Sequence, residues 1–300
     1  MHFANFKFHL TARLIGVKRM SEPEAAPQLS VVTSAPVALT TGGTFSPTTA
    51  TLISGPSEVA LVDTLYTPRD VELLGDEIEA TGKVLTTIFI THAHFDHYVG
   101  LGALLDRFPD ARGVALAPVV DLIEKNMAAD KTITDDWLPG NVTDYSRIPE
   151  VLDGNVFTVD GIELRAVDVG QADIEHSSVL HIPSIAAVIA GDVAYNGVHQ
   201  MLGLSGPDDW QRWIDSVDRV AALSPRTVVA GHKIPGRSDD DVAAILDGTR
   251  DYISAFMHES TVASGPEALV AAMVGHFPDF ANPATLHFSA MMHFQRERND

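Results

Sequence analysis

A hydrophobic stretch of the chain ends in four side chains of types that bind metal ions. Residues 88–91 are apolar or β-branched, and six residues then contain His92, His94, Asp96 and His97. Imidazole and carboxylate groups are ligands for zinc, iron and manganese. His92 and His94 lie on one side of an extended strand end and could share an ion. Asp96 and His97 follow after a turn and could hold a second ion at about 3.5–4 Å from the first, as in two-metal hydrolases.

Alternating strands and helices must position this loop. Apolar and β-branched runs predict strands, and Pro, Ser or Gly before an amphipathic run predicts a helix. We expect strands at residues 37–39, 49–53, 59–63, 84–91, 114–116, 155–159, 162–169, 179–182, 186–190 and 227–230, and helices from residues 68, 100, 207 and 238. This order predicts an α/β fold with two sheets, or one large mixed sheet, covered by helices.

The chain divides into three expected parts. Residues 1–28 are expected to be a disordered N-terminal tail, and residues 29–238 the metal-binding α/β domain. After residue 238 helical patterns replace the alternation, so residues 239–300 are expected to form a C-terminal helical extension that packs as a lid. Trp210 and Trp213, on the helix from residue 207, would give that lid an apolar face.

The N-terminus allows two start sites. Residues 1–20 carry four cationic side chains and no acidic one, and the apolar run at residues 14–17 is too short for a secretory signal. Met20 is followed by an ordinary polar stretch, so translation could start at Met1 or at Met20. We expect a cytoplasmic protein.

Composition and charge exclude several classes of protein. Hydrophobic residues make up 45% of the chain and charged residues 20%, which suffices for a buried core and excludes global disorder. Forty Asp and Glu against 20 Lys and Arg give a formal net charge of −20, which would repel nucleic acid. The absence of cysteine excludes disulfides, thiolate catalysis and cysteine-bound zinc. No apolar run is long enough for a membrane helix. We expect a small-molecule substrate, no nucleic-acid or membrane partner, and allow for a homodimer.

Two later residues extend the metal-binding pattern. Asp192 follows the predicted strand 186–190, where an isolated charge at a sheet edge is costly unless it meets a cation. His232 follows the predicted strand 227–230. With the H-x-H-x-D-H motif, this ordered set resembles the metallo-β-lactamase-fold hydrolases from about Val31 to Pro235. The resemblance implies a four-layer αββα sandwich with metals at the edge of the two sheets. It also implies these ligands: His92 and His94 for the first metal; Asp96, His97 and His232 for the second; Asp192 for both.

One segment departs from the family pattern. The family normally has Gly-His-Thr about twenty residues before the bridging Asp, supplying the third ligand of the first metal, whereas this chain has Gln171 there, 21 residues before Asp192. Gln171 through its carbonyl oxygen, or His176 through a rearranged loop, could replace that ligand. Because Gln binds zinc poorly, we expect a weakened or partly occupied first site, with one or two Zn²⁺ per chain and Mn²⁺ or Fe as alternatives. Asp63 stands where the family has a buried Asp that orients the metal loop.

The resemblance implies metal-assisted hydrolysis, in which a metal-activated water attacks an electrophilic centre. Asp96 and Tyr195 are the catalytic candidates, since lactonases of this superfamily carry a Tyr three residues after the bridging Asp that donates to the oxyanion. His199 could line the pocket, although a surface loop is the simpler interpretation. We expect a hydrolase of a small ester, lactone or related substrate, similar to the lactonase and esterase branch. The alternatives are a mononuclear-iron persulfide dioxygenase-like oxidoreductase, a β-lactam hydrolase and a non-catalytic metal-binding scaffold.

Overall fold

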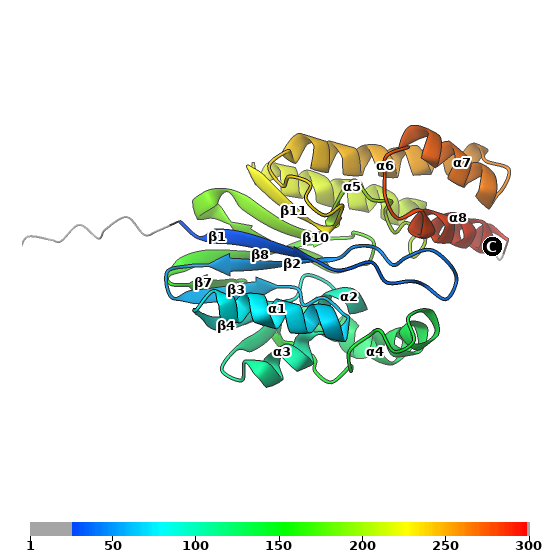
Figure 1. Ribbon diagram of the computed structural model, residues 1–300. Helices are drawn as coiled ribbons and strands as arrows, with labels where there is room; N and C mark the ends of the chain where they lie inside the picture. The colour runs from blue at the N-terminus through cyan, green and yellow to red at the C-terminus, as the bar shows by residue number, and fades with distance from the viewer. Residues whose placement is uncertain (1–25, 299–300) are drawn as a thin grey trace, which may run out of the picture.

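Two β-sheets face each other, and helices cover the outer face of each sheet (Figure 1). The computed structural model describes residues 26–298. The first sheet has the strand order β1-β2-β3-β4-β5-β6, and the second has the order β11-β10-β9-β8-β7. The four-layer αββα sandwich predicted from the sequence is confirmed.

The elements have the following bounds. The first sheet contains β1 (Gln28–Thr33), β2 (Thr49–Ser54), β3 (Glu58–Val62), β4 (Val84–Phe89), β5 (Arg112–Ala115) and β6 (Glu150–Val151). The second contains β7 (Val156–Val159), β8 (Ile162–Gly170), β9 (Ser177–Ile182), β10 (Ala187–Asn196) and β11 (Thr227–Lys233). The helices are α1 (Pro68–Ala80), α2 (Phe95–Tyr98), α3 (Leu101–Arg107), α4 (Ala117–Trp137), α5 (Pro207–Ala222), α6 (Val242–Val262), α7 (Pro266–His276) and α8 (Pro283–Glu297), with a short 3-10 helix at Pro183–Ile185.

Parallel strands bring the histidine-rich motif, Asp192 and His232 to one edge. β4 is parallel to both of its neighbours, β3 and β5, with Val62 opposite Phe89. In the second sheet, β10 and β11 are also parallel. Residues at the carboxyl ends of parallel strands can share a site because those ends meet at one edge of the sandwich. His92, Asp192 and His232 meet in this way.

Trp210 and Trp213 lie in the core, where α5 packs against β10 and α6. Trp213 donates from Nε1 to the carbonyl oxygen of Val193 over 3.0 Å, and the ring of Trp210 packs edge-to-face on Phe256 of α6 at 5.2 Å. Both indoles are fully buried. The amphipathic face of α5 is therefore buried against the sheet, and the expectation that these two residues form part of a lid is wrong.

The C-terminal helices continue the helical layer of the second sheet. Ile253 and Phe256 of α6 belong to the same buried cluster as Trp210, so the core crosses the expected boundary at residue 238. α8 also reaches the helices of the first sheet, where Phe288 packs edge-to-face on Trp137 of α4 at 5.2 Å. α4 and α8 lie at the same end of the sandwich (Figure 1). This aromatic contact joins the two outer layers.

Several local expectations are corrected. Residues 37–39 form no strand, because they sit in a loop where only an isolated bridge joins Ala38 and Thr44. The helix expected to be capped by Ser238 is capped instead by Asp241, whose side chain accepts from a backbone N–H of the first turn of α6. β1 and the long helix α4 were not predicted.

The expected tail, residues 1–28, lies outside the described residues except for its last three positions. No helix in the described part of the chain is both long and apolar enough to span a bilayer.

Candidate metal centre

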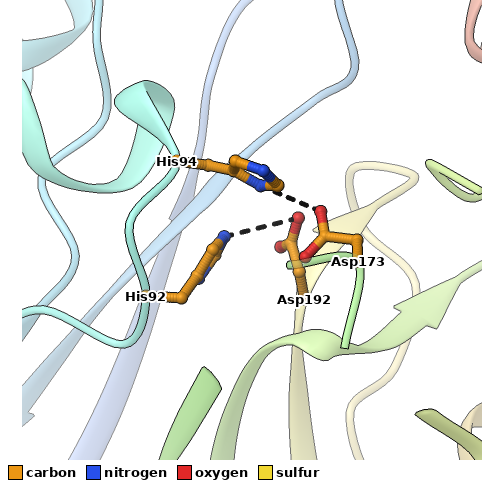
Figure 2. A group of neighbouring side chains, drawn as sticks. All are labelled: His92, His94, Asp173 and Asp192. Carbon is orange, nitrogen blue, oxygen red and sulfur yellow. Dashed lines mark ion pairs between the residues drawn. The ribbon is translucent and has the colours of Figure 1, made fainter. Parts of the chain in front are cut away.

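Seven histidines and aspartates meet at the edge shared by the two sheets. Within residues 26–298 they form a first ligand group and a second ligand group, and in each the potential ligand atoms lie within 4.8 Å of one another. The first ligand group is His92, His94, Asp173 and Asp192; the second is Asp96, His97 and His232. Figure 2 shows the first ligand group, with the two imidazoles facing the two carboxylates. The structure thus brings together all six residues that the sequence analysis expected to bind metal, and it places Asp173 beside them.

Asp192 lies between the two ligand groups. Its Oδ2 is 3.7 Å from Nε2 of His92 and 3.0 Å from Nε2 of His232, and its Oδ1 is 3.2 Å from Nε2 of His97. Two glycines make room for this carboxylate. A Cβ on Gly231 would collide with the Asp192 carboxylate, and a Cβ on Gly191, whose φ is +50°, would lie 2.7 Å from the Thr91 hydroxyl. Gly231 therefore lets β11 approach β10 closely at Asp192, and Gly191 lets β10 approach Thr91, which follows β4 in the other sheet.

Asp63 and Thr91 hold two imidazoles in place from behind. Asp63, at the end of β3 with φ +60°, accepts from Nδ1 of His97 at 2.7 Å and from the backbone N–H of Thr91 at 2.9 Å. The Thr91 hydroxyl also donates to Asp63, so its oxygen can accept from Nδ1 of His92, 2.9 Å away. Both imidazoles therefore turn Nε2 towards the ligand groups, as in metal sites whose ligands are oriented by an outer carboxylate.

The segment before β2 fixes the second ligand group in the same way. His232 uses Nδ1 to donate to the carbonyl oxygen of Pro47 at 3.2 Å, and Thr48 pairs with His232 as an isolated antiparallel bridge. The Thr48 hydroxyl donates to Oδ2 of Asp96 at 2.7 Å. Sequence reasoning missed Thr48, because it lies in a run of threonines that carries no chemical motif.

Asp173, in the same segment as Gln171 and His176, lies beside His94 in the first ligand group. Oδ2 of Asp173 lies 2.9 Å from Nδ1 of His94, and its side chain is 1% exposed. Gln171 instead donates to the carbonyl oxygen of Ala172, and His176 is exposed. The turn after β8 thus points the residue two positions beyond Gln171 towards the first ligand group. The sequence contains a signal for this residue, because Asp173 is a carboxylate only two positions from Gln171. Sequence reasoning instead considered Gln171, at the position of the family's histidine, and His176.

The unpartnered atoms of the two ligand groups fit bound cations. Nε2 of His92, Nε2 of His97, Oδ1 of Asp173 and Oδ1 of Asp192 are buried and find no hydrogen-bond partner among the described residues. Leaving such a group unpartnered costs about 1–3 kcal/mol. These nitrogen and oxygen atoms are the donors that zinc, iron and manganese bind in proteins. The residues present therefore fit one or two divalent metal ions.

The electrostatics of the two ligand groups point the same way. Burial alone lowers the pKa of His94, but the carboxylates of Asp173 and Asp192 outweigh it and raise that pKa to about 9. Burial raises the pKa of Asp173 to about 6 although His94 opposes the shift. For His97, burial acts downwards but Asp192, Asp96 and Asp63 hold its pKa well above the usual range. The buried carboxylates thus favour positive charge beside them, and metal ions would compete with protons for these atoms.

Tyr195 reaches the metal centre, whereas His199 does not join either ligand group. The Tyr195 hydroxyl donates to Oδ2 of Asp192 at 3.0 Å and is 3.5 Å from Oδ2 of Asp173. Its ring stacks on His232 at 5.2 Å. His199 is buried, and its Nδ1 lies 3.0 Å from the Tyr252 hydroxyl, so the surface-loop interpretation is wrong.

Comparison with known proteins agrees with this geometry. A family model described as the metallo-beta-lactamase superfamily matches residues 43–232, which include all seven residues of the two ligand groups. This protein belongs to the metallo-beta-lactamase superfamily. The match ends at the histidine of the second ligand group, so the C-terminal helices α6, α7 and α8 lie beyond it.

Other members of the metallo-beta-lactamase superfamily share the fold at low sequence identity. A family protein from Thermus thermophilus is similar with a TM-score of 0.60 and 20% identity, over 90% of this chain and 94% of that one. A metallo-beta-lactamase from Pontibacter korlensis has a TM-score of 0.57 and 18% identity, over 76% of this chain and 99% of that one.

A relative found by sequence is the atrochrysone carboxyl ACP thioesterase of Aspergillus fumigatus, 24% identical over 151 residues. The match covers 49% of this chain and 38% of the thioesterase, so it spans well under half the length of that protein.

Proposed function

We propose that this superfamily member is a metal-dependent hydrolase of a small carboxyl ester, including lactones and thioesters. The observation that carries the proposal is the pair of adjacent ligand groups with Asp192 between them. Two metal ions held side by side are typical of enzymes that activate water for hydrolysis. The thioesterase named among the relatives supports including thioesters in the substrate class.

The seven residues of the two ligand groups can be assigned to two metal positions. His92, His94 and Asp173 would hold one ion, Asp96, His97 and His232 a second, and Asp192 would contact both. Bound divalent ions would supply an activated water and polarise the carbonyl of the substrate. Six of the seven side chains are no more than 6% exposed, whereas His94 is 17% exposed. Substrate therefore approaches from the side of His94, and the protein keeps bulk water from the other ligands.

The Tyr195 hydroxyl lies at this centre, 3.0 Å from Oδ2 of Asp192. Burial and the neighbouring Asp192 raise the pKa of its phenol well above the usual range, so the hydroxyl keeps its proton. A neutral phenol can donate to an oxygen that gains negative charge in the transition state. In this structure the phenol donates its hydrogen bond to Asp192. To donate to the substrate instead, it must break that hydrogen bond. We assign Tyr195 this role in ester cleavage.

The two ligand groups also weigh against the oxidative alternative. A mononuclear-iron oxidoreductase needs one set of ligands, but this chain offers two sets of buried imidazole and carboxylate side chains. We therefore rank hydrolysis first and keep single-iron oxidation as an outcome that metal analysis would reveal.

A substrate panel tests the proposal. The full chain loaded with Zn²⁺, or with Mn²⁺, is assayed with lactones, aryl esters, acyl thioesters, phosphotriesters and a cephalosporin. We expect turnover of at least one carboxyl ester class, and less than about a tenth of that rate from Asp96→Ala at equal protein concentration. A chain that holds two ions and cleaves none of the carboxyl esters would overturn the proposal. Preferred cleavage of the cephalosporin would change the proposed activity to β-lactam hydrolysis.

A further inference from the structure

The two ligand groups supply the same kinds of donor once Asp173 is included. The first has two imidazoles, His92 and His94, and the carboxylate of Asp173. The second has the two imidazoles of His97 and His232 and the carboxylate of Asp96. Asp192 is within 3.7 Å of both groups. Each metal position is therefore offered two nitrogen donors, one carboxylate of its own and one shared carboxylate.

Asp173 changes the chemistry of the first position. With histidine as the third ligand, that position would offer three imidazoles and would be richer in nitrogen than the second. A carboxylate there adds an oxygen donor and a negative charge, and oxygen donors suit manganese while two imidazoles with one carboxylate suit iron(II). Three buried carboxylates, Asp96, Asp173 and Asp192, would also offset three of the four charges of two divalent ions.

The surroundings of Asp173 show a side chain aimed at this position. Its carboxylate is buried, with Oδ2 beside His94 and Oδ1 without a hydrogen-bond partner in the described part of the chain. The Tyr195 hydroxyl lies 3.5 Å from Asp173 and 3.0 Å from Asp192, so the phenol sits next to both carboxylates of the first ligand group. A surface carboxylate would point to solvent, whereas the Asp173 carboxylate is buried and contacts the imidazole of His94.

We propose that Asp173 makes the two metal positions equivalent. The protein then holds a pair of like ions with similar affinities, and it favours zinc over manganese less strongly than a first position with three histidines would. The inference rests on the metal dependence in the proposed function but not on the substrate. It differs from the sequence-based expectation of a weakened first site, which was drawn from Gln171.

Metal binding by the wild-type chain is the first test. Protein stripped by a chelator is titrated with Mn²⁺ and followed by electron paramagnetic resonance, and with Zn²⁺ by calorimetry. Matched donor sets predict two Mn²⁺ per chain with dissociation constants within about tenfold of each other. One strong and one weaker Mn²⁺ site, separated by a factor of about one hundred or more, would overturn the proposal without any variant.

Variants of Asp173 form the second test. Asp173→Asn is expected to lose one of the two ions, because a neutral amide binds more weakly than a carboxylate. Asp173→His is expected to keep two Zn²⁺ and to raise the ratio of zinc to manganese affinity, measured by competitive equilibrium dialysis, by about tenfold or more. Glu175→Gln, an exposed acid in the same segment, is the matched control and should behave as wild type.

The outcomes separate this inference from the proposed function. An unchanged affinity ratio in Asp173→His, or two Mn²⁺ bound as tightly by Asp173→Asn as by wild type, shows that Asp173 is not a ligand, even if the enzyme hydrolyses esters. Two equivalent ions with the expected response of the variants support the inference, even if no ester in the panel is cleaved.

Discussion

The hydroxyl of Thr48 donates to Oδ2 of Asp96 over 2.7 Å, although the two residues are 48 positions apart in the sequence. Thr48 immediately precedes β2, and Asp96 lies in the first turn of α2. The bond therefore joins the segment before β2 to the short helix that follows the histidine-rich loop. The neighbouring Pro47 carbonyl accepts from His232. The segment before β2 therefore orients two of the three side chains of the second ligand group.

Replacing Thr48 should weaken metal binding without unfolding the protein. Thr48→Val keeps the shape of the side chain but removes the donor to Asp96, and losing such an outer hydrogen bond typically lowers metal affinity by about 10–100-fold. Calorimetric titration of the stripped protein measures the change in affinity for the ion at the second ligand group. Thr48→Ser should restore binding, and the exposed Thr41→Val should leave it unaltered. A Thr48→Val chain with wild-type metal affinity would contradict the assigned role.

Tyr195→Phe should slow the reaction more than it weakens substrate binding. The change removes only the hydroxyl, so the stacking on His232 remains. If the phenol donates to the developing oxyanion, kcat falls about tenfold or more while KM changes little. Steady-state kinetics at saturating metal, with the metal content of each sample determined, provide the measurement. An unchanged kcat at full metal content would remove Tyr195 from the mechanism.

Gln171→His should not improve metal binding. The Gln171 side chain donates to a neighbouring carbonyl, and the inward position of this turn is held by Asp173. Zinc titration of stripped variant and wild type should therefore give the same stoichiometry and affinities. Tighter binding by the variant would show that residue 171 faces the first position and that Asp173 does not complete it.

Strongly patterned segments were predictable, and segments defined by distant contacts were not. The buried strand before His92 and the amphipathic face of α5 follow from local periodicity, and both are found as expected. Thr48 could not be placed, and Asp173 was recognisable only as a carboxylate in the expected segment, because each reaches the site through a turn or a loop whose path depends on packing. The roles of Trp210 and Trp213 were misjudged for a related reason: periodicity identifies a buried face but not what covers it.

His199 should make stability depend on pH. Burial lowers the pKa of His199 from 6.5 to about 4, so the unfolded chain takes up a proton in a range where the folded chain does not. Stability is therefore lost as the pH falls from about 6.5 towards 4. In metal-free protein, wild type should lose roughly 2 kcal/mol more than His199→Gln between pH 7.5 and pH 5, as measured by urea unfolding. Equal losses in the two chains would contradict this account of His199.

Stepwise restoration of metal to the stripped wild-type chain tests the central claim most directly. Hydrolysis of the best carboxyl ester substrate and bound metal are measured at each step, with Asp96→Ala as the comparison. We predict no hydrolysis in the stripped protein, activity that rises with added metal and reaches its plateau at two ions per chain, and less than about a tenth of that rate in Asp96→Ala, a barrier change of at least ~1.4 kcal/mol. Full activity in the stripped protein, or activity that does not follow metal content, would contradict a metal-dependent hydrolase.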